Sequence, residues 1–245
     1  MYHLITVATQ NVGRFEELIH NAYDTNVIVL GMGQKWTGFR MKFELVFEYI
    51  NSLPDDAIVI FVDGYDSTIN KDPSIAVNIF KNKGYKMLIS KDFDSISDLL
   101  RNQVFGFCNN IPVNSGLYMG YVYYLKQFIK ESLKFKCNDD QVITTKLCNI
   151  FDYVSIDDNN DIFYNYSPFE KSYKSNAVFL SYPGSFSIHR WVRSIREYSQ
   201  FFLNKLLTLF ILSIIMCIYH QKTRYIPYII VGFSSFYAYI DKSCI

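Results

Sequence analysis

A short run of apolar residues, 57–62, ends directly in a pair of acidic residues, and this junction constrains the fold more than any other feature of the chain. Six consecutive apolar residues, several of them β-branched, predict a strand that is buried on both faces of a sheet. Ligands of open α/β sheets bind outside the carboxyl ends of such strands, which is where Asp63 and Asp66 lie. Two neighbouring carboxylates are costly to bury unless they share a cation, so the junction predicts a divalent metal site.

An ordinary structural role is the alternative for the same two residues. Asp63 would then cap the element that follows the strand. Asp66 would occupy a turn together with Gly64, because Asp and Gly are both favoured in turns. The apolar run alone does not choose between a metal site and a turn.

Length and charge limit the classes to which the chain can belong. A chain of 245 residues can bury one sizeable α/β domain and still carry an appendage. Its formal net charge is +1, so no basic surface indicates a nucleic-acid partner. The five cysteines have no CxxC spacing, which predicts buried or free thiols in a reducing compartment rather than a disulfide framework or a zinc site.

Strand and helix patterns alternate up to about residue 200 without a Pro/Gly-rich linker or an internal repeat. This alternation predicts a single α/β domain over residues 1–200, in which the carboxyl ends of the first three strands meet at one crevice. The expected elements are strands at 4–9, 26–30, 57–62 and 178–180, and helices at 13–23, 39–53, 121–133 and 142–148. The second of these helices would turn four apolar residues toward the sheet: Met41, Leu45, Phe47 and Ile50.

The common phosphate-binding fingerprints are missing from the sequence. After Gly31 and Gly33, a GxGxxG pattern requires glycine where the chain has Trp36, and no GxxxxGK[ST] pattern occurs. Dehalogenase-type phosphatases place a second Asp two positions after the first, where the chain has Tyr65. The sequence therefore disfavours a dehydrogenase, a P-loop enzyme and a phosphatase of that type.

Two further polar motifs lie in the second half of the domain. Asn114, Ser115 and Gly116 precede a short predicted strand, and Asp139 and Asp140 open a predicted helix. Adjacent acids at a helix amino terminus are explained by capping and by the helix dipole alone. A functional role for them depends on what else the fold brings to the same place.

The carboxyl-terminal part, 201–245, differs from the rest because it is mostly apolar. An apolar run at 206–219, extended upstream by 201–203, approaches the roughly 20 residues that a bilayer requires. A second apolar stretch follows at 225–240, which predicts a transmembrane hairpin and a multi-pass membrane anchor. A buried helical hairpin in a soluble protein is the alternative.

The orientation of this hairpin is predicted from its flanking charges. Four basic residues precede the first span, which favours a cytosol-facing domain by the positive-inside tendency, whereas Lys222 and Arg224 in the connector oppose it. No signal peptide is visible before the first predicted strand, which favours the cytosol-facing orientation.

Five short motifs occur in a fixed order, at residues 7–9, 33–35, 61–66, 114–116 and 139–141. In this order they resemble the glycosyltransferase domain of the multifunctional procollagen lysyl hydroxylases and their relatives in large DNA viruses, over roughly residues 4–189. The resemblance implies a GT-A-like, Rossmann-type sandwich that binds a nucleotide sugar such as UDP-glucose or UDP-galactose together with Mn²⁺. It also implies a host-cell or virion membrane as the location.

The resemblance assigns donor-side roles to several residues. Asp63 and Asp66 would bind the metal that bridges the donor diphosphate, with His189 as a third ligand. The family commonly has Gly-Asn-Gly after this histidine, where the chain has Arg190 and Trp191, and Arg190 would neutralise the diphosphate instead. The remaining donor-binding residues that the resemblance implies are Thr6, Val7, Ala8 and Thr9 around uridine, Lys35 at the phosphates, and Trp36 and Tyr65 beside them. Plain packing is the alternative for Trp36.

On the acceptor side, the resemblance implies catalytic roles for Asp139, Asp140 and Asn114. One aspartate would remove the acceptor proton in an inverting reaction, or would orient the sugar in a retaining one. Asn114 and Gln141 would hydrogen-bond hydroxyl groups of the sugar or the acceptor. The acceptor itself stays open among a protein, a glycan and a lipid.

The sequence thus predicts a metal-dependent hexosyltransferase that is anchored in a membrane. Two other function classes stay open. The first is a degenerate transferase that binds nucleotide sugar without turnover, which the altered neighbours of His189 favour. The second is a membrane scaffold whose globular part docks other proteins, which the hydrophobic hairpin favours.

Overall fold

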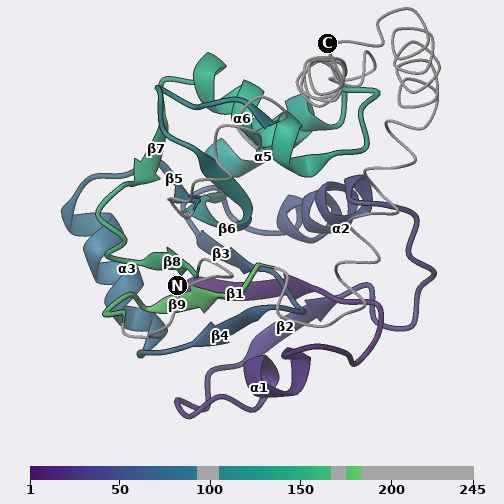
Figure 1. Ribbon diagram of the computed structural model, residues 1–245, viewed down its shortest axis with the longest axis vertical. Coiled ribbons are helices and arrows are strands. Elements are labelled where there is room, and N and C mark those ends of the chain that lie inside the picture. The colour runs from purple at the N-terminus through teal and green to yellow at the C-terminus, as the bar shows by residue number, and fades with distance from the viewer. Residues whose placement is uncertain (93–104, 167–174, 184–245) are drawn as a thin grey trace, which may run out of the picture.

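In the computed structural model, residues 1–92, 105–166 and 175–183 are described, and they form an α/β domain (Figure 1). The alternation of strands and helices agrees with the predicted fold class. In chain order the elements are β1 Tyr2–Val7, α1 Phe15–Ile19, β2 Val27–Leu30, α2 Arg40–Asn51, β3 Ile58–Val62, β4 Ser67–Ile69, α3 Pro73–Asn82, β5 Met87–Lys91, β6 Val113–Tyr121, α5 Val122–Ser132, α6 Asp140–Ile150, β7 Val154–Asp157, β8 Phe163–Asn165 and β9 Phe179–Ser181.

The main sheet has six strands in the order β2-β1-β3-β6-β5-β7. The first three are parallel to one another, whereas β6 runs antiparallel to both β3 and β5. Because β2, β1 and β3 are parallel, their carboxyl ends lie at one edge of the sheet, and the chain leaves β3 there through Asp63. The predicted convergence of the first three strands is therefore confirmed.

Alternate residues of the central strands enter two different hydrophobic clusters. On one face, Val59 and Phe61 pack with α2, α5 and α6, and on the other Ile58 and Ile60 pack with α1, α3, β8 and β9. Every residue of β3 is buried, as its apolar sequence predicts. Burying a side chain of this size stabilises the fold by about 2 kcal/mol. The sheet is thus covered on both faces, with the helix layer above and the smaller elements below in Figure 1.

A second, three-stranded sheet has the order β4-β9-β8. It lies against the face of the main sheet that carries Ile58 and Ile60. Strand β9 runs antiparallel to β4 and parallel to β8. This pairing places Ser67, which follows the turn after β3, beside Ser181 near the end of the described chain. Of its strands, the sequence analysis expected only β9, as the strand at 178–180. β4 and β8 were not expected, because strands of three residues give too short a pattern.

Several element boundaries differ from the sequence expectations. The helix expected at 13–23 is only α1, and helix α6 starts at Asp140 rather than at residue 142. In α2, Leu45 and Phe47 are only partly buried, and Lys42 takes a place on the buried face. Asn114, Ser115 and Gly116 lie within the long strand β6 instead of preceding a short one.

The cysteine prediction was wrong for Cys108, Cys137 and Cys148, which are all disulfide-bonded. Cys108 and Cys148 form a disulfide with a Cα–Cα distance of 5.7 Å. The bond joins the segment before β6 to the end of α6, and both cysteines are buried. Such a pairing is not deducible from spacing, because it depends on how the helix packs against the sheet.

The predicted hairpin at 201–245 lies outside the described residues, as do His189 and Arg190. Among the residues that are described, none of the helices has both the length and the hydrophobicity needed to cross a bilayer. The membrane anchor therefore stays a prediction.

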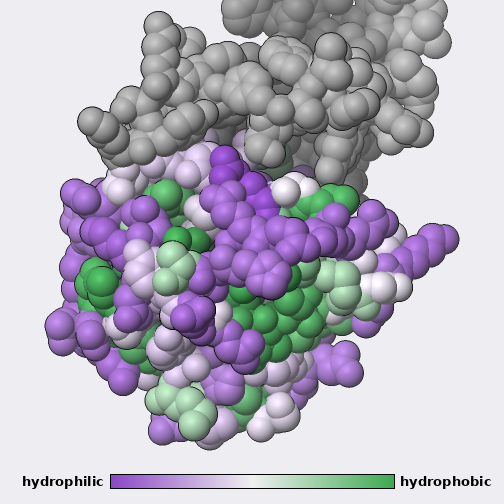
Figure 2. Space-filling view, turned by 90° about the horizontal axis from the view of Figure 1, so that it is seen from below, coloured by the Kyte–Doolittle hydropathy of each residue, from purple (hydrophilic) through white to green (hydrophobic). Residues whose placement is uncertain are grey.

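On the face that Figure 2 shows, hydrophilic side chains surround a smaller hydrophobic area.

Candidate active site

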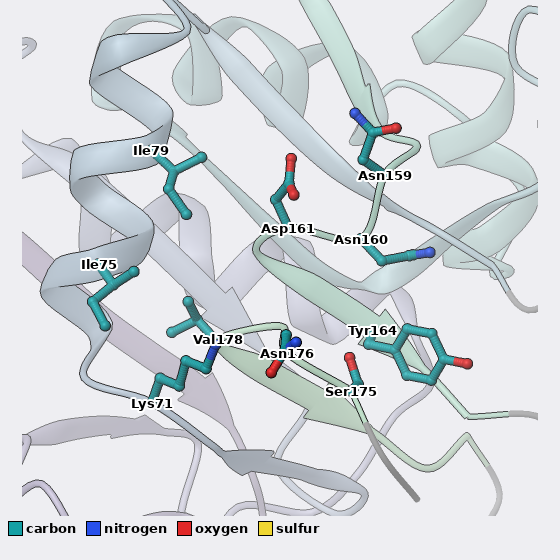
Figure 3. A pocket seen from close by; sticks show the side chains of 10 residues that line it. All are labelled: Lys71, Ile75, Ile79, Asn159, Asn160, Asp161, Tyr164, Ser175, Asn176 and Val178. Carbon is teal, nitrogen blue, oxygen red and sulfur yellow. The ribbon is translucent and has the colours of Figure 1, made fainter.

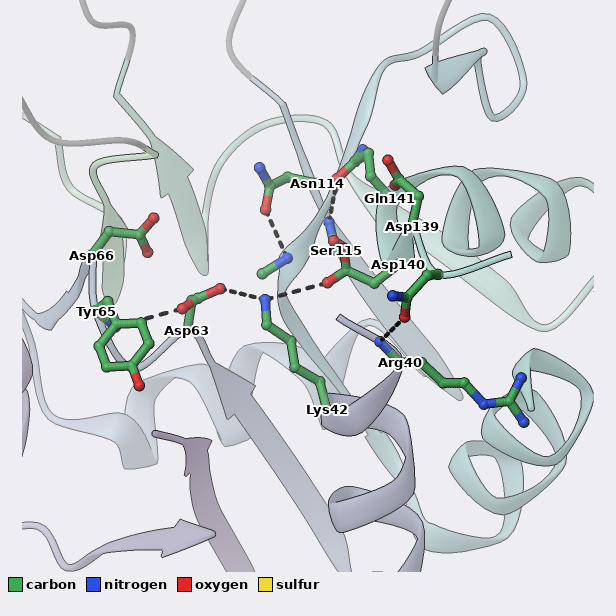
Figure 4. Close-up of polar contacts among 12 residues, drawn as sticks. Arg40, Lys42, Asp63, Tyr65, Asp66, Asn114, Ser115, Asp139, Asp140 and Gln141 are labelled. Atoms are coloured by element: carbon green, nitrogen blue, oxygen red, sulfur yellow. Dashed lines mark hydrogen bonds and ion pairs between the residues drawn. The ribbon is translucent and has the colours of Figure 1, made fainter. Parts of the chain in front are cut away.

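Asp63 and Asp66 lie in the turn that follows β3, at the edge where the parallel strands end. Asp63 accepts a hydrogen bond at Oδ2 from Lys42 Nζ at 2.6 Å. Asp66 Oδ1 accepts from Ser181 Oγ at 3.3 Å, so the small sheet holds the second carboxylate. Residues 64–66 form a turn, which confirms the part of the alternative that places Asp66 in a turn with Gly64. Both carboxylates lie beside other polar groups (Figure 4).

Lys42 is the residue that connects the two halves of this site. Its Nζ lies 2.6 Å from Asp63 Oδ2 and 3.2 Å from Asp140 Oδ2, and Figure 4 shows it between the two carboxylates. Burial alone would lower the pKa of Lys42, but the charges of Asp140 and Asp63 outweigh burial and raise the pKa above its ordinary value. Lys42 is therefore a permanent buried cation that two carboxylates neutralise.

The Asp139–Asp140 pair opens helix α6, as expected, and its two members have different roles. Asp139 is the N-cap residue and accepts from the Val142 N–H at 3.0 Å, which confirms the capping role. Asp140 is buried and faces Lys42. Burial, followed by the negative charge of Asp140, raises the pKa of Asp139 to about 6. Asp139 thus titrates near neutral pH, as an acid–base group requires.

Gln141 and Asn114 use their side chains mainly to fix the backbone of β6. Gln141 Oε1 accepts from the Ser115 N–H at 2.9 Å, and its Nε2 donates to the Val113 carbonyl. Asn114 Oδ1 accepts from the Gly116 N–H at 2.7 Å. Gln141 therefore holds α6 against β6, and the ligand contact that the resemblance implies for it stays a prediction.

Gly116 lies directly beside Asp63, and its lack of a side chain makes room for both Asp63 and Asn114. A Cβ atom at this position would lie 2.9 Å from Asn114 Oδ1 and 3.6 Å from Asp63 Oδ2. The first distance is too short for a real Cβ contact, so a larger residue would displace the amide. Steric crowding thus explains why glycine occupies the last position of the Asn-Ser-Gly motif, and this crowding is not visible in the sequence.

The expected uridine-binding residues at the end of β1, Thr6, Val7, Ala8 and Thr9, are all buried. The Thr6 hydroxyl donates to the Val62 carbonyl at 2.7 Å. The Thr9 N–H donates to the Tyr65 hydroxyl at 2.8 Å. The pair of Thr9 and Tyr65 therefore joins the end of β1 to the turn that carries the two carboxylates.

The backbone of Tyr65 is held from the other side by the segment before α1. The Arg14 N–H donates to the Tyr65 carbonyl at 2.9 Å. Gly13 has φ of +65°, and a Cβ there would lie 2.3 Å from the same carbonyl oxygen. Only glycine permits this close approach. Hydrogen bonds at both its hydroxyl and its carbonyl thus fix Tyr65.

Lys35 and Trp36 lie in an exposed loop between β2 and α2. The Trp36 ring packs edge-on against Phe39 with 5.7 Å between centroids, and Phe39 lies 5.4 Å from Lys42 Nζ. Arg40 anchors the end of the loop by donating to the Leu133 and Phe135 carbonyls, both at 2.6 Å. The two aromatic rings thus lie between the solvent and the buried ammonium of Lys42.

The described residues offer carboxylate oxygens to a divalent cation at this site, but they do not form a complete ligand set. Asp63 and Asp66 offer the hard oxygen ligands that Mn²⁺ accepts. Within the described parts of the chain, no three His, Cys, Asp or Glu side chains gather into a metal-binding group. Lys42 already occupies Asp63 Oδ2. The carboxylates fit a cation that is completed by ligands from elsewhere, such as the expected His189.

Sequence reasoning missed Lys42, although a signal for it exists. Phe39, Lys42 and Val46 share one helical face, and Val46 belongs to the core. A lysine on an apolar helix face predicts a buried partner of opposite charge. The sequence did not indicate that Asp140 is one of these partners, because Asp140 lies 98 positions away from Lys42 in the chain.

The mixed sheet and the polar cluster at its edge define an α/β protein with a Rossmann-type arrangement of strands. The model of the family described as PLOD GT domain matches residues 1–169, so the chain belongs to that glycosyltransferase family. This confirms the resemblance to procollagen lysyl hydroxylases. The viral relatives stay a prediction.

Three curated relatives come from animals. A multifunctional procollagen lysine hydroxylase and glycosyltransferase of Caenorhabditis elegans is 29% identical over 161 residues, which cover 59% of this chain and 22% of the relative. Procollagen-lysine,2-oxoglutarate 5-dioxygenase 2 of Homo sapiens is 24% identical over 160 residues, covering 59% and 21%. The matched stretch thus spans about a fifth of the length of each relative.

Solved structures are less similar to this chain in sequence than these relatives are. Galactosyltransferase LgtC has a TM-score of 0.47 at 12% identity, with 76% of this chain and 88% of that chain covered. A putative glucose-1-phosphate thymidylyltransferase from Bacillus anthracis has a TM-score of 0.42 at 10% identity, covering 64% and 86%. Both scores are too low to carry an argument about function.

Proposed function

We propose that this glycosyltransferase domain moves a hexose, glucose or galactose, from a UDP-sugar to a hydroxyl group of a protein, glycan or lipid acceptor, with Mn²⁺ as cofactor. The observation that carries the proposal is the ion-pair chain from Asp63 through Lys42 to Asp140. It joins the carboxyl end of β3, where nucleotides bind in α/β sheets, to the amino terminus of α6. Donor-side and acceptor-side carboxylates thereby belong to one cluster.

On the donor side, Asp63 and Asp66 would hold the cation, with His189 as the proposed third ligand. The cation would offset the negative charge that develops on the departing diphosphate. Lys35, in the exposed loop, and Arg190 are proposed to contact the phosphates. Tyr65 and Thr9 would border the uridine at the end of β1, where they already contact each other.

On the acceptor side, Asp139 and Asp140 divide two tasks. Asp140 is held in place by its ion pair with Lys42, so it can orient hydroxyl groups of the sugar. Asp139 has a pKa of about 6 and is suited to take the proton from the acceptor hydroxyl. Asn114 is proposed to position the donor sugar, because Gly116, to which its Oδ1 is hydrogen-bonded, lies beside Asp63.

Thermal unfolding with UDP and Mn²⁺, added separately and together, tests the donor site. A ligand that binds only the folded chain raises its melting temperature. The proposal expects a shift that requires both UDP and Mn²⁺ and disappears in Asp63→Asn. The absence of any nucleotide-dependent shift would contradict it. Retention of near-normal transfer in Asp140→Asn, when Asp63→Asn abolishes transfer, would contradict the acceptor-side role.

A binding domain without turnover is a second candidate, because the Lys42 ammonium competes with a metal ion for Asp63 Oδ2. Metal-dependent hydrolysis of the UDP-sugar distinguishes the two. An active transferase releases UDP slowly even without acceptor, whereas a binding domain shows the thermal shift and releases none. The membrane anchor at 201–245 remains part of the proposal, whereas the Cys108–Cys148 disulfide opposes the predicted cytosol-facing orientation.

A further inference from the structure

A second concave site lies on the face of the main sheet that α3 and the small sheet cover. It has a volume of about 490 Å³, which is within the range of small-molecule sites. Its walls come from α3, from the loop before β8 and from the segment before β9 (Figure 3). The lining residues are Lys71, Ile75, Ile79, Asn159, Asn160, Asp161, Tyr164, Ser175, Asn176 and Val178.

One wall of the cavity is apolar. Ile75 and Ile79 lie one turn apart on α3, and Figure 3 shows both on the helix face toward Val178. Ile75 is 40% exposed, which is high for a large apolar side chain. The Tyr164 ring lines the cavity from β8. Apolar and aromatic surfaces of this kind fit the CH faces of a sugar ring.

The rest of the lining is rich in carboxamides. Asn159, Asn160 and Asn176 each offer two N–H donors and one carbonyl acceptor. In the described part of the chain, none of the three side chains forms a hydrogen bond with the protein. Asn160 has φ of +55°, a left-handed conformation that asparagine tolerates. Paired donors and acceptors of this kind match neighbouring hydroxyl groups.

The two charged residues that line the cavity, Lys71 and Asp161, have opposite charges. Asp161 Oδ2 also lies 2.6 Å from Lys83 Nζ, so its charge is already paired. A neutral ligand is therefore favoured over a charged one. We propose that this cavity binds a neutral pyranose sugar without acting on it, at a site distinct from the candidate active site.

The two sites lie at opposite ends of the small sheet. Asp66 contacts Ser181 at one end of β9, whereas Lys71 and Val178 lie beyond the other end of the β4–β9 pair. Strands of three residues span about 10 Å, so the sites are separate in space. The cavity does not depend on the proposed transfer activity, and its occupant does not have to be the donor or the acceptor.

Saturation-transfer NMR on the full chain tests the cavity, with methyl β-galactopyranoside and methyl α-glucopyranoside as probes. The double variant Asn160→Gly and Asn176→Ala removes two carboxamides and keeps the left-handed conformation at residue 160. At least one probe should bind to the wild type, and the double variant should weaken that binding at least about tenfold. Asn78→Ala is the matched control, because it removes an exposed carboxamide from α3 outside the cavity.

The outcomes separate this site from the transferase site. Sugar binding that persists in Asp63→Asn, together with an unchanged UDP and Mn²⁺ shift in the cavity double variant, supports the proposal. Absence of binding by both probes, loss of binding in Asp63→Asn, or equal weakening by Asn78→Ala would overturn it. Stronger binding of methyl β-glucuronide than of either neutral glycoside would overturn the choice of a neutral ligand.

Discussion

The Lys42 ammonium lies 3.2 Å from the carboxylate of Asp140, a residue 98 positions further along the chain. The same ammonium lies 2.6 Å from Asp63. A single buried cation thus holds the carboxyl end of β3 and the amino terminus of α6 together. The relative placement of the two groups of carboxylates depends on this one side chain.

Replacement of Lys42 by methionine should leave the buried carboxylate of Asp140 and the partly buried carboxylate of Asp63 without a counter-charge. Loss of one partner of a buried ion pair costs about 3 kcal/mol or more, and we expect the free energy of unfolding to fall by that amount in a metal-free buffer. Mn²⁺ should restore part of the loss in the variant. Urea unfolding with and without Mn²⁺ measures both effects.

Lys134→Met is the matched control for this substitution. Lys134 pairs with Glu131 on the surface, and its side chain is 63% exposed. Exposed pairs contribute little to stability, so this variant should unfold like the wild type. Equal destabilisation by both substitutions would show that Lys42 has no special role.

Asp139 should make stability depend on pH between about 4 and 6. Its pKa is raised from 3.8 in the reference state to about 6 in the folded chain. A carboxyl whose pKa is raised by folding contributes stability at a pH below the unfolded value, and this contribution is lost as the pH rises through the folded value. The loss amounts to about 3 kcal/mol. Urea unfolding across this pH range measures it.

Asp139→Asn keeps an N-cap acceptor while it removes the charge, because asparagine caps helices as well as aspartate does. The pH dependence near 6 should therefore become weaker in the variant while α6 stays folded. Transfer by the wild type should rise through pH 6 if Asp139 is the base. A variant that keeps the wild-type pH profile of stability would contradict the assignment of this pKa.

Gly116→Ala should impair ligand binding more than folding. The added methyl group would meet Asn114 Oδ1 at 2.9 Å and lie near Asp63, so it displaces groups of the candidate site. The thermal shift produced by UDP and Mn²⁺ should decrease strongly. Gly120→Ala lies in the same strand but would meet Leu125 and the Lys86 carbonyl at 3.2 Å, away from the site. That variant should lose stability and keep its thermal shift.

The disulfide between Cys108 and Cys148 should stabilise the domain by restricting the unfolded chain. The two cysteines are 40 positions apart, and closure of such a loop is worth about 4 kcal/mol in the chain-entropy model. Replacing both with serine should lower the melting temperature. A reducing agent should destabilise the wild type much more than this variant, as measured by thermal unfolding.

The same bond bears on the compartment of the domain. Disulfides persist in oxidising compartments, which opposes the cytosol-facing orientation predicted from the sequence. Alkylation of the chain from intact cells, compared between the wild type and the double serine variant, reports the redox state of the pair. Free thiols at both positions in cells would favour the cytosol.

How much the sequence could predict is clear from particular residues. The buried strand β3 and the carboxylates after it were predictable, because a continuous apolar run and its polar end are local features. The position of Asp139 at a helix start was predictable for the same reason. Two contacts could not be predicted: the ion pair of Lys42 with Asp140, and the hydrogen bond of Gln141 with the backbone of β6. Each depends on how α2 and α6 pack against β6.

The fixation of Tyr65 has a consequence for the speed of donor capture. Thr9 holds its hydroxyl and Arg14 holds its carbonyl, so the turn between Asp63 and Asp66 is already ordered before any nucleotide arrives. Little conformational entropy is then lost on binding, which is the benefit of preorganisation. We expect association to follow a single exponential whose rate rises linearly with nucleotide concentration, without a slower rearrangement afterwards.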